Sequence, residues 1–199
     1  RTDVQLRVLS VDDTRPLGDL ELGLGAIEVT SRVTGYQRRD VLNGQILGHQ
    51  DLDLPPQQLV TRGYWWVIPP EVLRAARIPD ASVPGALHAA EHAAIGILPL
   101  FTICDRWDVG GVSTPWLDDT KGPTIVIYDG HPGGAGIAEM GFEFADRQLQ
   151  ATLDVLDRCR CRDGCPSCVQ SPKCGNWNEP LDKHAAARLI RAAGLPDLT

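Results

Sequence analysis

Five of the six cysteines in this chain lie in one short run between Cys159 and Cys174. A segment of that length buries little apolar surface, so a bound metal would have to supply much of its folding free energy. Within the run, Cys165-Pro-Ser-Cys168 is typical of a metal knuckle, because two intervening residues let both thiolates reach one ion. The neighbouring glycine and proline favour the turn that this geometry requires. The run therefore predicts a small module that metal binding stabilises.

Zinc is the metal that this cysteine pattern favours, since a structural zinc ion takes four thiolates in a tetrahedron. Two ligands beyond the Cys165 and Cys168 knuckle must come from Cys159, Cys161 and Cys174, so four of the five bind. The sequence leaves open which cysteine is left over. Two disulfides with a spare thiol, or an iron–sulfur cluster, are the alternatives. Catalytic zinc is disfavoured because such sites keep an open position and usually include His or carboxylate ligands.

Composition is that of an ordinary globular protein. The 199 residues are 43% hydrophobic and 23% charged, which fits one large domain or two small ones. The longest apolar stretch, 93–101, is far shorter than the roughly 20 residues of a membrane helix, so we expect no membrane partner. Because the chain begins at Arg1 and its one methionine is Met140, we interpret it as a segment of a longer polypeptide. The expected compartment is cytoplasmic, where clustered cysteines more often bind metal than pair.

Charge is unevenly distributed along the chain. The whole sequence carries a net charge of −7, but residues 158–191 contain seven basic and three acidic residues, a net of +4. A basic metal module with an aromatic side chain suits single-stranded DNA, because it offers phosphate contacts and a stacking ring. An ordinary solvated surface is the alternative interpretation. The candidate DNA contacts are Arg160, Arg162, Lys173, Trp177 and Lys183, with His131 from a glycine-rich loop.

Hydrophobic periodicity predicts strands in the first third of the chain and mostly helices after it. Alternation of β-branched and polar residues predicts a hairpin of 26–34 with 36–42, a further strand at 61–68 and a buried strand at 123–128. Helical spacing predicts helices near 72–78 and 87–98, one continuous helix over 137–156 and a last helix over 181–193.

The predicted fold class is therefore α+β, with a β-rich N-terminal part, a mixed α/β core and a small helical four-cysteine zinc module at the C-terminus. The predicted regions are a β-rich lead-in at 1–80, an α/β core with a glycine loop at 81–158, and the zinc module with its C-terminal helix at 159–199.

The predicted helix over 87–98 contains the sequence His88-Ala-Ala-Glu91-His92. This is the H-x-x-E-H spacing of inverted zinc peptidases, in which two histidines share a helix face and the glutamate acts on water. A metal-dependent hydrolase is therefore an alternative function, although no downstream glutamate ligand stands out. The other interpretations are a buried polar network that includes Asp105 and Asp129, or a polar helix surface that could face DNA. We predict no catalytic residue in this segment.

Residues 128–137 form a predicted arrangement of strand, glycine loop and helix, with four glycines at 130, 133, 134 and 136. Exposed amides at a helix N-terminus suit a phosphate group of DNA. The loop lacks the Lys-Ser/Thr ending of a P-loop, so nucleotide hydrolysis is not supported. A tight turn that packs the helix on the strand is the alternative.

Several of these motifs together resemble one known family. They are the His88-Ala-Ala-Glu91-His92 helix, the loop 105–111, the glycine loop 128–136 and the cysteine run, which is followed by Gly-Asn-Trp-Asn-Glu-Pro-Leu-Asp-Lys183. Over about residues 86–190 the chain resembles the C-terminal zinc-binding domain of helicases of the mitomycin-repair (MrfA) type. The cysteine run is the most specific part of this resemblance.

The resemblance implies a module of an ATP-dependent 3′ to 5′ DNA helicase of superfamily 2 that acts in DNA repair. It implies a structural zinc ion held by four cysteines, and helicase motor domains of the same polypeptide as a partner beside single-stranded DNA. It also implies a winged-helix region in the N-terminal third. The segment has no Walker A motif and no DEAH-type box, so by itself we expect it to hydrolyse no ATP. A protein-docking module within the helicase is a further alternative.

Overall fold

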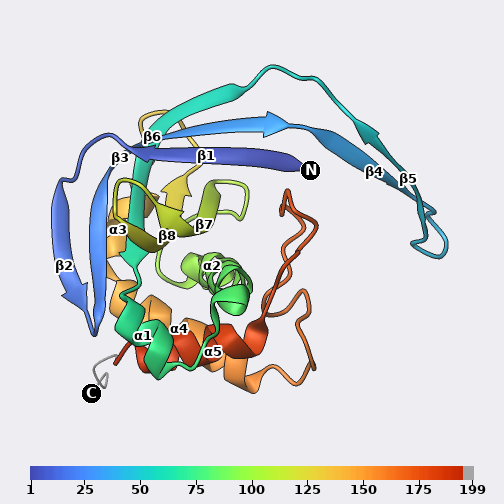
Figure 1. The fold of residues 1–199 in the computed structure, drawn as a ribbon. Coiled ribbons are helices and arrows are strands. Elements are labelled where there is room, and N and C mark those ends of the chain that lie inside the picture. Colours follow the sequence, from blue (N-terminus) through green and yellow to red (C-terminus); the bar gives the residue numbers. More distant parts are fainter. Residues whose placement is uncertain (195–199) are drawn as a thin grey trace.

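The computed structural model describes residues 1–194 and contains one antiparallel sheet packed against helices (Figure 1). The strands lie in the order β1-β3-β6-β8-β7, and β2 pairs with the first half of β3 beside β1. Their bounds are β1 Thr2–Val8, β2 Asp13–Leu17, β3 Leu20–Val33, β6 Gln57–Val67, β7 Val109–Leu117 and β8 Gly122–Asp129. The predicted α+β class is confirmed.

Strand β6 illustrates how alternation fills both faces of this sheet. Tyr64 and Trp66 are buried in the core that faces the helices, whereas Trp65 between them belongs to a smaller core on the opposite face. Because successive side chains of a strand point to opposite faces, three adjacent aromatic residues anchor the strand from both sides. The predicted strand 61–68 is thus part of a longer one.

The predicted hairpin of 26–34 with 36–42 is wrong. Strand β3 continues to Val33 and pairs along one edge with β1 and β2 and along the other with β6, so neither of its edges is left for the next segment. Strand β4 (Gly35–Arg39) pairs instead with β5 (Ile46–Asp51). Together β4 and β5 form a separate two-stranded ribbon that extends away from the rest of the molecule (Figure 1).

Helix α2 (Val83–Ile97) occupies the centre of the molecule, between the sheet and a layer of helices (Figure 1). That layer contains α1 (Pro70–Ala75), α4 (Ala145–Arg158) and α5 (Lys183–Ala192). Eleven of the 15 residues of α2 are buried, and most of these are alanine or other small residues. A helix with so little exposed surface buries most of the polar side chains that it carries. Glu91 and His92 are therefore interior residues.

Two further expectations are corrected. The predicted continuous helix over 137–156 is two helices, α3 (Ile137–Glu143) and α4, because Phe144 between them has non-helical backbone angles (φ −96°, ψ 15°). The break lets α3 pack on β6 while α4 packs on α2 and α5. The winged-helix region implied for the N-terminal third is not present either, since the regular elements described before Pro70 are all strands.

One hydrophobic core includes residues from all three predicted regions, such as Leu22, Leu87 and Leu189. The predicted region boundaries at residues 80 and 158 remain a prediction, because regions that share one core can still be distinct parts of the domain. Within residues 1–194, none of the helices has both the length and the apolar character needed to traverse a lipid bilayer.

The contact between α3 and β6 gives a test of the packing. A methyl group on Gly141 would lie 2.3 Å from the Tyr64 ring, which is fully buried and donates its hydroxyl hydrogen to Gln148. We expect Gly141→Ala to lower the free energy of unfolding by about 1–3 kcal/mol in denaturant titrations, since the ring has no space to move into.

The control is Gly96→Ala in α2, where the nearest atom to a new methyl group is 4.0 Å away. Alanine there improves helix propensity and should raise the free energy of unfolding by about 0.5–1 kcal/mol. If both substitutions stabilise the chain equally, the packing of α3 against Tyr64 is not as described.

Candidate metal centre

Four of the clustered cysteines converge on one point beyond the end of α4. Cys159 directly follows the helix, Cys161 lies in the next loop, and Cys165 and Cys168 form a tight turn closed by a backbone hydrogen bond of 3.0 Å. The sulfur of Cys159 lies 3.5 Å from those of Cys161 and Cys165. The sulfur of Cys168 lies 3.5 Å from that of Cys161 and 3.8 Å from that of Cys165.

These separations fit a tetrahedral zinc ion. Four thiolates at about 2.3 Å from a central zinc ion are about 3.8 Å from each other, whereas the sulfurs of a disulfide are about 2.05 Å apart. All six cysteines are unpaired in the structure, so the disulfide alternative finds no support among them. With four sulfur donors closing the tetrahedron, a zinc ion held here would be structural.

Lys183, at the start of α5, supports the same cluster. Its ammonium group donates to the carbonyl oxygens of Cys159 at 2.6 Å and Cys161 at 3.0 Å, and lies 3.4 Å from the Cys161 sulfur. Burial opposes ionisation of the Cys161 thiol, but hydrogen bonds from the other three thiols and from Lys183 lower its pKa to about 7. Because four thiolates around Zn²⁺ leave two negative charges, a buried ammonium partly neutralises the site.

Cys174 lies outside this cluster and faces the two histidines of α2 instead. Its sulfur is 3.4 Å from Nε2 of His88, and its ligand atom lies within 4.8 Å of those of both His88 and His92. That four of the five clustered cysteines bind zinc stays a prediction. In the structure, Cys174 is the one of the five that lies outside the group of four.

Glu91 lies beside the histidines but turns toward β7. Burial raises the pKa of Glu91, and a hydrogen bond from Ser113 offsets part of this increase. Glu91 lines a cavity of about 480 Å³ together with His88, His92 and Cys174. Burial also raises the pKa of Tyr128, another lining residue, to about 12. The proposed link from Asp105 does not reach this group, because the carboxylate of Asp105 accepts from the Trp107 amide within its own loop.

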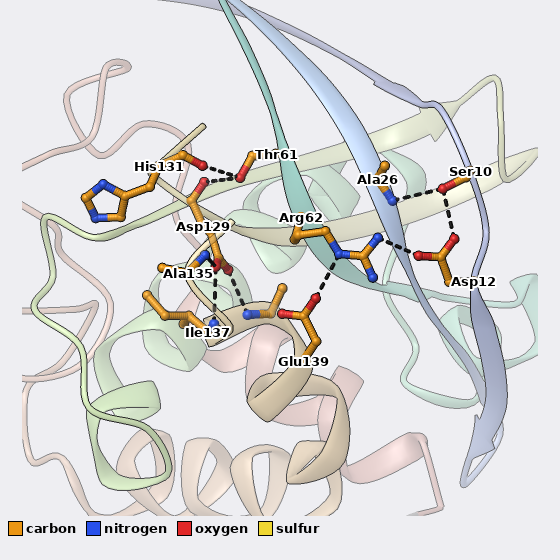
Figure 2. Close-up of polar contacts among 11 residues, drawn as sticks. Ser10, Asp12, Ala26, Thr61, Arg62, Asp129, His131, Ala135, Ile137 and Glu139 are labelled. Atoms are coloured by element: carbon orange, nitrogen blue, oxygen red, sulfur yellow. Dashed lines mark hydrogen bonds and ion pairs between the residues drawn. The ribbon is translucent and has the colours of Figure 1, made fainter. Parts of the chain in front are cut away.

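The glycine loop is organised by Asp129 at the end of β8 (Figure 2). The carboxylate of Asp129 accepts hydrogen bonds from the backbone amides of Ala135, Ile137 and Ala138, the last at 2.7 Å. These are the amides that a bound phosphate would need. The interpretation of this loop as a DNA phosphate site is therefore wrong, and the alternative of a packed turn holds.

Two residues that the sequence did not single out join this loop and the helix α3 after it to the sheet (Figure 2). Thr61 donates to the carbonyl oxygens of Asp129 at 2.9 Å and His131 at 2.7 Å, and Arg62 bridges Asp12 and Glu139. Their partners lie 50 to 77 residues away in the chain, a separation at which local patterns carry no information.

The predicted DNA-contact residues have different environments. Arg160 and Arg162 are exposed, but Lys183 is 4% exposed and holds the cysteine loop. Lys173 donates to the carbonyl oxygens of Arg106 and Val109, both at 2.9 Å, and His131 pairs with Asp108. Burial of Lys183 argues against contact with DNA at that position.

Trp177 is 38% exposed and lies beside the β4–β5 ribbon. Its ring is 5.5 Å from the ring of His49, and both line a groove of about 570 Å³ together with Tyr36.

Comparisons with known proteins agree with this geometry. The family model described as the MrfA Zn-binding domain matches residues 90–169. An uncharacterized protein of Methanocaldococcus jannaschii is 43% identical over 107 residues, which are 52% of this chain and 96% of that protein. The ATP-dependent helicase YprA of Bacillus subtilis is 31% identical over 83% of this chain and 22% of the helicase.

The structural comparison extends over nearly the whole chain. A crystal structure of the helicase MrfA bound to DNA aligns with 96% of this chain and 25% of its own, with a TM-score of 0.70 and 28% identity. The fold and the four converging cysteines define a zinc-binding α+β domain of the kind found in these helicases. This chain belongs to the MrfA zinc-binding domain family. It spans about a fifth to a quarter of the length of the helicases that it matches.

The cysteine cluster gives the second test. We expect Cys161→Ser to release zinc from the purified chain and to lower its thermal stability, because a metal ligand and one of the three contacts of Lys183 are lost together. Changes outside the ligand set cost roughly 10–100-fold in metal affinity, so loss of a ligand should exceed that range. Zinc content by mass spectrometry and a chelator competition assay measure the effect.

Cys104→Ser is the matched control, since Cys104 is a half-buried thiol that belongs to neither metal-ligand group. It should keep the zinc content of the parent chain. Equal zinc loss in both variants would contradict the assignment of Cys161 as a ligand.

Proposed function

We propose that this chain is a zinc-stabilised accessory domain of an ATP-dependent 3′ to 5′ DNA helicase acting in DNA repair in the cytoplasm. In this proposal it contacts single-stranded DNA and couples that contact to motor domains of the same polypeptide. The observation that carries the proposal is the alignment of nearly the whole chain with one quarter of a DNA-bound helicase. The match to a further helicase over most of the chain supports it.

In the proposal, Zn²⁺ is bound by Cys159, Cys161, Cys165 and Cys168 and has a structural role. The ion would join the end of α4 to the start of α5, because Lys183 of α5 donates to carbonyl groups of the metal loop. These residues hold the C-terminal part of the domain in place and take no part in a chemical step.

The electrostatic part of DNA binding rests in this proposal on Arg160 and Arg162. Two other basic residues of the C-terminal part have partners within the domain, since Arg191 pairs with Asp157 at 2.7 Å and Arg188 donates to the carbonyl of Ala76. The side chain of Arg162 is 94% exposed and its contact with Asp163 at 3.6 Å is weak, so it remains available to a phosphate.

The groove between the β4–β5 ribbon and the loop after Cys174 supports the single-stranded form of DNA. Trp177, Tyr36 and His49 line it, and aromatic rings stack on unpaired bases whatever their sequence. Duplex DNA offers no exposed base faces to such rings. The groove therefore favours a strand that has already been separated.

The arginine contribution is tested by titrating labelled single-stranded DNA at several salt concentrations. The double variant Arg160→Gln, Arg162→Gln should bind more weakly, and the slope of log K against log[salt] should become less negative by about 1 to 1.5. Arg7→Gln is the control, because Arg7 is an exposed arginine on β1 that contacts Glu28 at 3.9 Å. Unchanged affinity of the double variant at low salt would favour the protein-docking alternative over DNA contact.

The stacking contribution is tested with Trp177→Ala, which should weaken binding of single-stranded DNA by roughly tenfold, since one base stack contributes about 1–3 kcal/mol. Trp116→Ala removes a more exposed tryptophan, 58% exposed on β7, and should leave binding unchanged. If the two variants behave alike, the groove beside the ribbon is not the DNA site.

A further inference from the structure

A second group of metal-ligand atoms lies between α2 and the loop that follows the cysteine cluster. His88 and His92 are one helical turn apart, and their ring centroids are 4.2 Å apart at an angle of 64°. The sulfur of Cys174 approaches both from a loop 86 residues away in the sequence. His88 and Cys174 fall outside residues 90–169, the part of the chain that the family model covers.

The hydrogen bonds of the two histidines determine which nitrogen is free to bind. Nδ1 of His88 lies 2.8 Å from the carbonyl oxygen of Pro180, and Nδ1 of His92 lies 2.7 Å from that of Val169. A carbonyl oxygen can only accept, so both Nδ1 atoms carry hydrogen and both neutral rings present a lone pair at Nε2. This is the arrangement in which histidine ligands of zinc are held by partners outside the ligand set.

Cys174 is held in the same way as a ligand of the first cluster. The backbone amide of Asn178 donates to its sulfur at 3.3 Å, as the amide of Cys165 does to the sulfur of Cys168 at 3.3 Å. The loop achieves this by placing Trp177 and Asn178 in the left-handed region, with φ of 58° and 63°. Amide donors favour the thiolate form of a cysteine, which is the form that binds metal.

Two imidazole lone pairs and a sulfur thus face one another, an arrangement that a cation between them would stabilise. A zinc ion with about 2.05 Å to nitrogen and 2.3 Å to sulfur would separate them by about 3.6 Å, close to the 3.4 Å between Cys174 and His88. Copper sites of the same donor set usually add a methionine, and the one methionine of the chain, Met140, is absent from the cavity lining.

We propose that His88, His92 and Cys174 bind a second zinc ion, whose fourth coordination position opens into the cavity of about 480 Å³. The fourth ligand is a water molecule or a small molecule with an oxygen or sulfur donor, because three protein ligands leave one position of a tetrahedral zinc ion open. Glu91 lines the same cavity but lies outside the ligand group. The site is independent of the DNA-binding proposal.

The two zinc sites are coupled through one residue. Val169, whose carbonyl anchors His92, directly follows Cys168 of the first cluster. Loss of the first zinc should therefore misplace His92 and weaken the second site. Because such coupling is reciprocal, loss of the second zinc ion should weaken the first site to the same extent, but the first cluster keeps all four cysteine ligands and should still bind its ion.

The experiment measures zinc bound per chain by mass spectrometry, after metal removal and reloading with Zn²⁺ of the full 199-residue protein. The expected content is two zinc ions per chain. His88→Ala and Cys174→Ser should each bind one zinc ion, and Cys104→Ser, the thiol control, should bind two.

Cobalt substitution distinguishes the sites independently of metal content. When Co²⁺ occupies both sites, five thiolates contribute to the thiolate-to-cobalt absorption. Cys174→Ser should remove only the contribution of its own thiolate, whereas Cys161→Ser should remove most of the absorption. One zinc ion per wild-type chain, or two that survive both His88→Ala and Cys174→Ser, would overturn the proposal. The first result would mean that a protonated imidazole and a thiolate form the group without metal.

Discussion

Burial of most of α2 is the constraint on which the rest of the structure depends. A helix of mostly small residues lets the sheet approach from one side and α4 and α5 from the other, so one core joins the N-terminal strands to the C-terminal helix. The same burial requires a partner for each polar group that α2 carries. His92 finds one in the carbonyl of Val169, and Glu91 finds one in Ser113. The loop that follows Cys168 is therefore attached to the central helix by the buried side chain of His92.

This arrangement makes the metal cluster part of the core. Lys183 connects the loop between Cys159 and Cys161 to α5, and the backbone amide of Asp182 donates to the carbonyl of Gly85 in α2 at 3.0 Å. Free energy released when four thiolates bind zinc would consequently stabilise the packing of α5 on α2 as well as the loop. A short segment that lacks a core of its own obtains one by this route.

Neither the net charge of the whole chain nor the count of basic residues in its C-terminal part shows which charges are free to contact a partner. The net charge of −7 hides a C-terminal part with a net of +4, yet Lys183 and Arg191 of that part have partners inside the domain. Arg160 and Arg162 of the cysteine loop are exposed, and the proposed contact with phosphate rests on them. The proposed DNA surface is consequently smaller in charge and richer in aromatic rings than the composition suggests, with Trp177, Tyr36 and His49 along one groove.

Local spacing determined the knuckle of Cys165 and Cys168, the central helix and the α+β class, because each depends on residues a few positions apart. The family could also be inferred from motifs of that length. Only the tertiary structure separated Cys174 from the other cysteines, filled the glycine loop with the carboxylate of Asp129 and buried Lys183. The contact of Cys174 with His88 spans 86 residues. Such contacts follow from how the helices and the sheet pack, which no local pattern encodes.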